Sequence, residues 1–164
     1  METTTGTAEI GNLDAFLDEL DRIGRATDCA IQALDARYVA GPEQLERAVA
    51  LANRSFERGE NVARERGVEI LLYAAGRRQI NRAFEIGVSE GAREIVLVAD
   101  GENEKRAVEA LEELLDGGGW EPGERADAER ISEFYGITDV ERAATDASLC
   151  DLVCERVALL EVEK

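Results

Sequence analysis

The spacing of hydrophobic residues along the chain predicts several amphipathic helices. The first spans residues 13–25, where Leu13, Leu17 and Leu20 share one face and Asn12 is a good N-cap. A second helix begins at Pro42, because proline is pre-set for a first helical turn. In all, helices are expected over residues 13–25, 42–66, 77–87, 107–115 and 131–135, and over a longer C-terminal segment.

Three short runs of apolar residues predict β-strands, over residues 29–34, 68–74 and 94–99. The run 68–74 follows Gly67, a natural C-terminal stop for the helix before it. Apart from Glu69, this run is apolar on both faces, as an interior strand requires. We therefore expect it to be the core strand of the sheet.

The last third of the chain is expected to be helical after a glycine-rich connector over residues 117–123. Thr138 and Glu141 form a capping box that opens a long helix. The inner stripe of this helix comprises Val140, Ala144, Ala147, Cys150, Cys154 and Val157. The pattern predicts one α/β domain over residues 1–164, a small mixed sheet covered by helices with a helical C-terminal segment. It leaves open the strand order and whether residues 157–162 are helical or extended.

Acidic residues outnumber basic ones throughout the chain. Among its 164 residues, 36 Asp and Glu oppose 19 Lys and Arg, which gives a net charge of −17, and only Lys105 and Lys164 are lysines. Such a balance is typical of proteins from a salt-rich cytoplasm, where salt screens the repulsion among carboxylates. A halophilic source is therefore our hypothesis.

The sequence contains no histidine, which excludes Ser-His-Asp triads, histidine general bases and most zinc sites. Cys29, Cys150 and Cys154 are too few for a four-thiolate zinc site and odd in number for a secreted disulfide framework. We expect no metal, no cofactor and no small-molecule substrate. No apolar run approaches the length of a membrane span and no leader opens the chain, so we expect a soluble, cytoplasmic protein without a membrane partner.

Glu69 is the most unusual carboxylate, because a charge within an apolar run must be paired, protonated or placed at an open strand end. Arg77 and Arg78 lie just beyond the run and can reach back toward it, so an ion pair is favoured over catalysis. One alternative function is nevertheless an α/β enzyme that binds a small anion through Glu69, Arg77 and Arg78.

Arginine is concentrated in residues 37–82, which hold 9 arginines and 6 glutamates, a net charge of +3 against −20 for the rest of the chain. At the end of this region, the turn at Gly76 is expected to present free backbone N–H groups beside arginines at a helix N-terminus, an arrangement that binds anions. Gln79 is suited to a base or sugar, and Tyr38 or Tyr73 to stacking. The alternative interpretation is a solvated surface paired with nearby glutamates.

Several segments together resemble a known family. They are residues 34–41, 59–63, 68–80 and 155–162, and the most specific part is Glu69-Ile70-Leu71-Leu72-Tyr73 followed by Arg77-Arg78-Gln79-Ile80. This pattern is similar to the small subunit of the KEOPS complex, the PRPK-binding protein family. One departure is Gln44, where the family pattern has a histidine.

The resemblance implies a non-catalytic subunit that binds the small atypical kinase of the complex and the 3′ acceptor end of tRNA, in the synthesis of threonylcarbamoyladenosine. On this chain, it places the tRNA contacts at Arg77, Arg78, Gln79, Arg82 and Asn61. It places the kinase interface at Val153, Val157, Leu159, Leu160 and Val162. A further alternative is a structural subunit that only braces the kinase.

Overall fold

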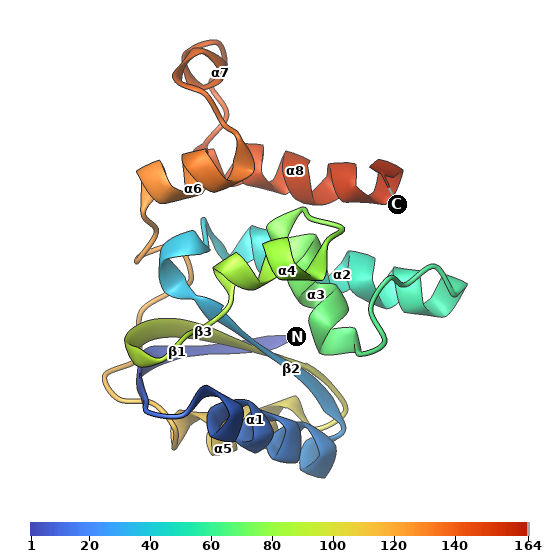
Figure 1. Ribbon diagram of the computed structural model, residues 1–164, viewed down its shortest axis with the longest axis vertical. Helices are drawn as coiled ribbons and strands as arrows, with labels where there is room; N and C mark the ends of the chain where they lie inside the picture. The colour runs from blue at the N-terminus through green and yellow to red at the C-terminus, as the bar shows by residue number, and fades with distance from the viewer. Residues whose placement is uncertain (164) are drawn as a thin grey trace.

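A three-stranded antiparallel sheet lies at the centre of the computed structural model, which describes residues 1–163 (Figure 1). The strand order is β1-β3-β2, and both neighbouring pairs are antiparallel. The strands are β1 (Glu2–Ile10), β2 (Cys29–Asp35) and β3 (Gly91–Gly101). The predicted α/β class, a small sheet covered by helices with a helical C-terminal segment, is confirmed, but the sheet is antiparallel rather than mixed.

Helices cover both faces of the sheet (Figure 1). On one face lie α1 (Leu13–Thr27) and α5 (Glu104–Glu112), and on the other lie α2 (Pro42–Arg58) and α3 (Arg66–Ala75). Because successive side chains of a strand point to opposite faces, β3 contributes to two hydrophobic cores. Ile95 and Leu97 belong to the core under α1 and α5, whereas Val96 and Val98 belong to the core under α2 and α3.

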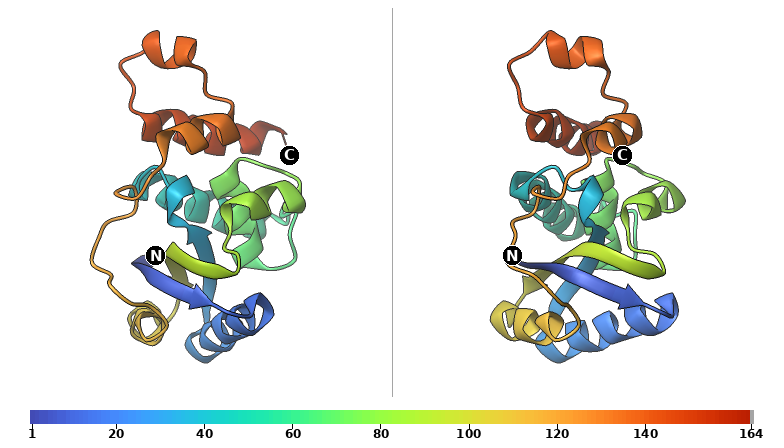
Figure 2. Two further views of the ribbon diagram at one scale, coloured as in Figure 1. Left: turned by 60° about the vertical axis from the view of Figure 1, so that its left-hand side comes forward. Right: turned by 90° about the vertical axis from the view of Figure 1, so that its left-hand side faces the viewer.

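A further layer of helices covers α2 and α3 on the side away from the sheet. It contains α6 (Ala128–Tyr135) and α8 (Leu149–Glu163), while the short helix α7 (Asp139–Ala143) projects beyond them (Figure 2). Shorter elements connect the layers: η1 (Ala36–Tyr38), α4 (Ile80–Ala83) and η2 (Phe84–Ile86). Within residues 1–163, no helix combines the length and the apolar character needed to cross a membrane.

The first helix and two of the strands agree with the sequence prediction. Asn12 caps α1, since its side-chain oxygen accepts a hydrogen bond from the backbone N–H of Ala15 at 3.0 Å. The strands expected at 29–34 and 94–99 are β2 and the middle of β3. The C-terminal tail, left open by the sequence, is helical as far as Glu163.

The predicted core strand at 68–74 is wrong, because this segment is helix α3. All residues from Glu69 to Ala75 are buried, since α3 is enclosed by α2, β2 and α8. A helix buried on every side is as uniformly apolar as an interior strand, so hydrophobic periodicity does not separate the two. Gly67 is correspondingly not a stop; α2 ends earlier, at Gly59, whose φ of 68° is left-handed.

Two predicted helices are shorter than expected. The segment 77–87 forms only α4 and the turn η2, with Ile80 and Phe84 exposed rather than inward. Thr138 does cap the predicted helix, because its hydroxyl accepts from the Glu141 N–H at 3.1 Å. The Glu141 carboxylate, however, binds Arg156 at 2.5 and 2.6 Å, and the helix ends at Ala143. The predicted inner stripe from Val140 to Val157 therefore spans two helices and the loop between them.

Strand β1 was not predicted, and the glycine-rich connector runs along its outer edge. Thr7 exchanges two backbone hydrogen bonds with Asp116, of 2.7 and 2.9 Å. The Thr5 hydroxyl donates to the carbonyl oxygen of Trp120 at 2.6 Å, and a Cβ on Gly118 would lie 2.3 Å from the Thr5 carbonyl oxygen. The connector thus needs glycine for its close approach to β1.

Asp100, near the end of β3, joins helices α2 and α3 to the sheet. Its carboxylate accepts hydrogen bonds from Arg66 at 2.5 Å and from Asn53 at 3.0 Å. Arg66 begins α3 and also donates to the Asp100 carbonyl oxygen at 2.6 Å, whereas Asn53 lies on α2. One carboxylate therefore fixes two helices against the strand.

Candidate functional site

The turn after α3, at residues 76–79, is the first predicted site. Gly76 has a left-handed φ of 61° and ends the helix. The Gly76 N–H donates to the Tyr73 carbonyl at 3.0 Å, and the Arg77 N–H donates to the Leu72 carbonyl at 3.1 Å. The prediction that this turn presents free backbone N–H groups to an anion is therefore wrong for Gly76 and Arg77, because both of these groups close the end of α3.

Arg77 is half-buried and connects the end of α3 to α6. Its guanidinium lies 4.8 Å from the centre of the Phe134 ring and donates a hydrogen bond to the Phe134 carbonyl. Such contacts fix both the position of the arginine and the orientation of the ring. Arg77 is thus part of the packing between α3 and α6 rather than a freely exposed cation.

Around Phe134 the structure assembles an arginine–aromatic surface, made of Tyr38, Arg77, Arg82, Arg130 and Phe134. Arg82 lies 6.0 Å from the Phe134 ring, and Arg130 lies 5.9 Å from the Tyr38 ring. The rings of Tyr38 and Phe134 meet edge to face at 5.6 Å. Planar guanidinium groups beside aromatic rings are a combination that binds unstacked bases and phosphates. A base can stack here on the half-buried ring of Tyr38 but not on Phe134, which is buried and only orients the Arg77 guanidinium. Tyr73 cannot take part in stacking, because it is buried and donates its hydroxyl to Glu161.

The remaining residues predicted to contact tRNA lie in different places. Arg78 and Gln79 are exposed in the turn, and Arg78 donates to the Glu163 carbonyl at 3.3 Å. Asn61 lies in the loop before α3 and donates to the Ala63 carbonyl at 2.8 Å. The ten residues of α3, a length of about 15 Å, separate that loop from the turn, so the structure does not bring Asn61 together with Arg78.

The cluster of Glu69, Arg77 and Arg78 suggested for an anion-binding enzyme does not assemble. Glu69 lies in the first turn of α3, where its carboxylate accepts from the Ser55 hydroxyl at 2.8 Å and from the Val62 and Ala63 N–H groups at 3.0 Å. The two arginines follow the opposite end of the helix. The predicted ion pair is replaced by hydrogen bonds that hold the loop between α2 and α3.

The predicted kinase interface divides into buried and exposed residues. Val153, Val157 and Leu160 are buried against α2 and α3, and thus complete the core of this chain. They are not available to a partner in this conformation. Leu159 and Val162 are exposed, by 51% and 82% of their surfaces, on the outer side of α8. Exposed apolar side chains of this size mark a candidate contact surface.

Cys150 and Cys154 lie one turn apart on α8, close to Glu43 of α2. The Cys150 thiol donates to the Glu43 carboxylate at 3.6 Å. A hydrogen bond between the thiols lowers the pKa of Cys154 and raises the pKa of Cys150. Among residues 1–163, no group of three or more Cys, Asp or Glu side chains is arranged to hold a metal ion.

Comparison with known families provides the assignment. Residues 8–161 match the family described as kinase binding protein CGI-121. The chain belongs to the CGI-121 family. No curated protein matches it. The family match runs from within β1 to within α8, so it includes both the turn after α3 and the exposed side of the last helix.

Gln44 replaces the histidine that the family pattern led us to expect. In this CGI-121 chain its side chain has hydrogen-bond partners within the core. It is buried, accepts from the Ala40 N–H at 2.8 Å, and donates to the Ala74 carbonyl at 3.0 Å and to the Tyr135 hydroxyl at 2.8 Å. Tyr135 in turn donates to the same carbonyl at 2.6 Å. The amide supplies both an acceptor and donors, so the position is satisfied without histidine.

Phe134 is the residue that sequence reasoning missed at the arginine–aromatic surface. It is separated by 57 positions from Arg77, whose guanidinium it orients. The available signal was its place in the short apolar segment 131–135, which predicted a buried helix face and no particular partner. Only the position of α6 beside the turn after α3 identifies it.

Proposed function

We propose that this chain is the kinase-binding, non-catalytic subunit of a KEOPS complex and that it also binds tRNA during threonylcarbamoyladenosine synthesis. Membership of the CGI-121 family carries the kinase part of the proposal. The three free cysteines suit the reducing environment of the cytoplasm, where tRNA modification takes place. We expect ATP turnover by the isolated chain to be indistinguishable from buffer.

The kinase contact is assigned to the outer side of α8, around Leu159 and Val162. Their replacement by serine in a Leu159→Ser/Val162→Ser variant removes apolar surface without opening the core, because both side chains are exposed. We expect at least about tenfold weaker binding of the cognate KEOPS kinase, measured by calorimetry.

Val140→Ser provides a matched control, because Val140 is 79% exposed on α7. We expect this variant to bind the kinase as the wild type does. Equal affinities for the double variant and the wild type would remove α8 from the interface. Failure of the wild type to bind the kinase would overturn the kinase part of the proposal itself.

The tRNA contact is assigned to Arg78, Gln79 and the arginine–aromatic surface. Short-range contacts have to suffice, because the chain carries a net charge of −17 and does not attract nucleic acid from a distance. Arg78→Ala should lower the affinity for tRNA by about 1–3 kcal/mol, since a charged hydrogen-bond donor is lost. The measurement is fluorescence anisotropy with tRNA that carries or lacks its terminal ACCA.

Arg106→Ala is the control for this experiment, because Arg106 is exposed on α5, at the opposite face of the sheet. We expect Arg106→Ala to bind tRNA normally and removal of ACCA to weaken binding by the wild type. Equal losses at Arg78 and Arg106 would remove the turn from the site. No tRNA binding by the isolated wild-type chain would favour a subunit that only braces the kinase.

A further inference from the structure

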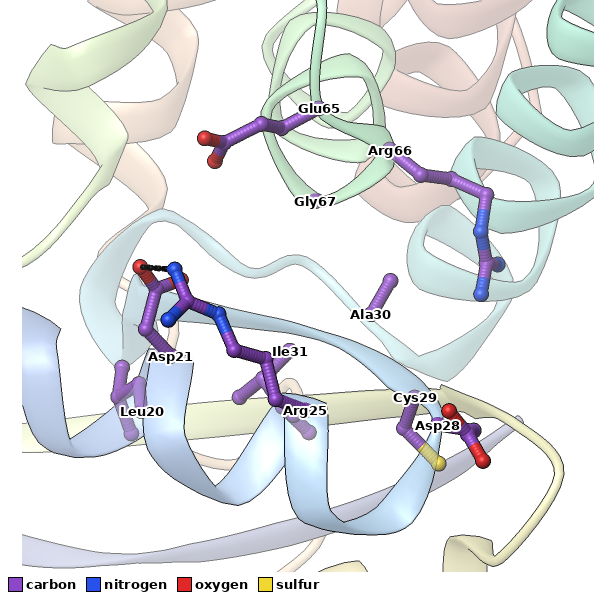
Figure 3. Close-up of a pocket in the computed structure, with 11 residues that line it drawn as sticks. Leu20, Asp21, Arg25, Asp28, Cys29, Ala30, Ile31, Glu65, Arg66 and Gly67 are labelled. Atoms are coloured by element: carbon purple, nitrogen blue, oxygen red, sulfur yellow. Dashed lines mark ion pairs between the residues drawn. The ribbon is translucent and has the colours of Figure 1, made fainter.

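A groove lies between α1 and the beginning of α3, with the outer edge of β2 as its floor (Figure 3). It consists of two adjoining hollows of about 490 and 220 Å³ that share the lining residues Leu20, Asp21, Ile31, Glu65 and Gly67. The larger hollow extends to Asp28 and the smaller to Leu17 and Phe84. We call this feature the α1–α3 groove; it contains neither the turn after α3 nor the exposed residues of α8.

The floor of the α1–α3 groove cannot readily accept an added β-strand, because the outward carbonyl groups of β2 are already covered. The Ala33 carbonyl accepts from the Gln32 side-chain amide at 3.0 Å. A Cβ on Gly67 would lie 2.9 Å from the Ile31 carbonyl oxygen, and a Cβ on Gly24 would lie 2.8 Å from that of Cys29. An occupant therefore binds through side chains rather than through backbone pairing.

The walls of the α1–α3 groove combine apolar side chains with an acidic rim. Leu17 and Phe84, which both line the smaller hollow, are exposed by 42% and 57%, and adjoining exposed apolar side chains of this size mark a contact surface. The exposed acidic residues along the groove are Asp18, Asp21, Asp28 and Glu65.

The two basic residues along the groove already have acidic partners. Arg25 lies 3.8 Å from Asp21, and Arg66 is bonded to Asp100, outside the groove. Figure 3 shows Glu65 and Arg66 pointing in opposite directions on either side of Gly67. The rim therefore carries an uncompensated negative charge.

We propose that the α1–α3 groove binds a basic amphipathic helix of a protein partner. The apolar face of that helix fills the space between Leu17, Ile31 and Phe84, and its Arg or Lys residues pair with the acidic rim. The groove extends along α1 from Leu17 to Asp28, which is about 16 Å or three helical turns. This length accommodates apolar side chains at positions i, i+4 and i+7 of the occupant.

A synthetic helical peptide tests the proposal on the full-length chain. The probe is a capped peptide of about five helical turns with leucine along one face and arginine on both flanks; the comparison peptide has glutamate in place of arginine. We expect saturable 1:1 binding of the basic peptide by calorimetry, and no binding of the acidic one. Phe84→Ser should weaken binding of the basic peptide at least about tenfold, because the apolar contact between the peptide and Phe84 is lost.

A control variant distinguishes groove binding from non-specific attraction between a basic peptide and an acidic protein. Val140→Ser removes an apolar side chain on α7 that is even more exposed than Phe84, 79% against 57%, and should leave the affinity unchanged. Equal affinities for Phe84→Ser and the wild type, or equal losses at Phe84 and Val140, would overturn the proposal, as would binding of the acidic peptide. Phe84→Ser should still bind the kinase and tRNA, so this test is independent of the proposed function.

Discussion

At the residue scale, Asp100 gives a defined dependence of stability on pH. Burial by itself raises the pKa of a carboxyl, but hydrogen bonds from Asn53 and Arg66 outweigh it and hold the pKa of Asp100 below its ordinary value of 3.8. Since the pKa is lower in the folded state, the stabilisation is fully present above the unfolded-state value. It is lost as the pH falls through the lowered folded-state value.

Asp100→Asn should therefore reduce the free energy of unfolding by about 1.5–3 kcal/mol at pH 7, because a charged acceptor is removed from two helices. The difference from the wild type should shrink as the pH falls below about 4. Urea titrations at a series of pH values measure this difference in the free energy of unfolding. The exposed neighbour Glu102→Gln should have little effect, and a difference for Asp100→Asn that stays constant down to pH 2 would contradict the assignment.

Single residues also show what the sequence can and cannot predict. That Glu69 is buried and partnered followed from its apolar neighbours, but the partners were expected to be arginines. They include the Ser55 hydroxyl and two backbone N–H groups of the loop before α3. Backbone donors are present at almost every residue and leave no mark on side-chain patterns, so such partners are visible only in the folded structure.

At the scale of elements, the position of α3 depends on Gly67. Alanine is a better helix former than glycine by up to about 1 kcal/mol. At Gly67, however, a Cβ would lie 2.9 Å from the Ile31 carbonyl oxygen, which belongs to the backbone of β2 and cannot rotate away. Close packing of helix on strand therefore outweighs helix propensity at this position.

Gly67→Ala should destabilise the protein by about 1–3 kcal/mol, because α3 has to shift from β2. Gly11→Ala is a matched control, since a Cβ there meets nothing within 4 Å and the φ of Gly11 is not left-handed. Thermal and urea unfolding of both variants measure the effect. A Gly67→Ala protein as stable as the wild type would show that the contact between α3 and β2 adapts easily.

The elements that the sequence predicted correctly are those with one buried face. Helix α1 has a clear apolar side and a capping residue, and both were recognised. The error at α3 and the omission of β1 have opposite causes. Segment 68–74 is apolar on every side, whereas β1 contains four threonines and few large apolar residues, so neither shows a decisive periodicity.

At the scale of the whole molecule, the net charge of −17 predicts a response to salt. Repulsion among carboxylates is stronger in the compact folded state than in the expanded chain, and salt screens it. Raising KCl from 0.1 to 2 M at pH 7 should increase the melting temperature, by about 2–4 °C for each kcal/mol of repulsion relieved. The increase should largely disappear near pH 4.4, the isoelectric point expected from the sequence. A melting temperature independent of KCl at pH 7 would contradict this account.

The candidate sites were predictable in part at this scale. The turn at Gly76 and the end of the chain were identified from the sequence, but their contacts come from segments far away along it. Phe134 of α6 meets Arg77, and Tyr73 meets Glu161 of α8. These meetings depend on how the outer helices pack on α2 and α3, which the hydrophobic pattern of each segment does not specify.

The two outer strands of the sheet have their edges covered, β1 by the segment 116–118 and β2 by Gln32, Gly24 and Gly67. In dilute buffer, mutual repulsion keeps such acidic molecules apart, but in 1 M salt the Debye length is only about 3 Å and this protection is lost. Covered edges do not depend on ionic strength, because they deprive neighbouring copies of a template for cross-β growth. The blocked positions on both edges thus oppose the addition of a further strand in concentrated salt, the condition in which the charge of the molecule is least effective.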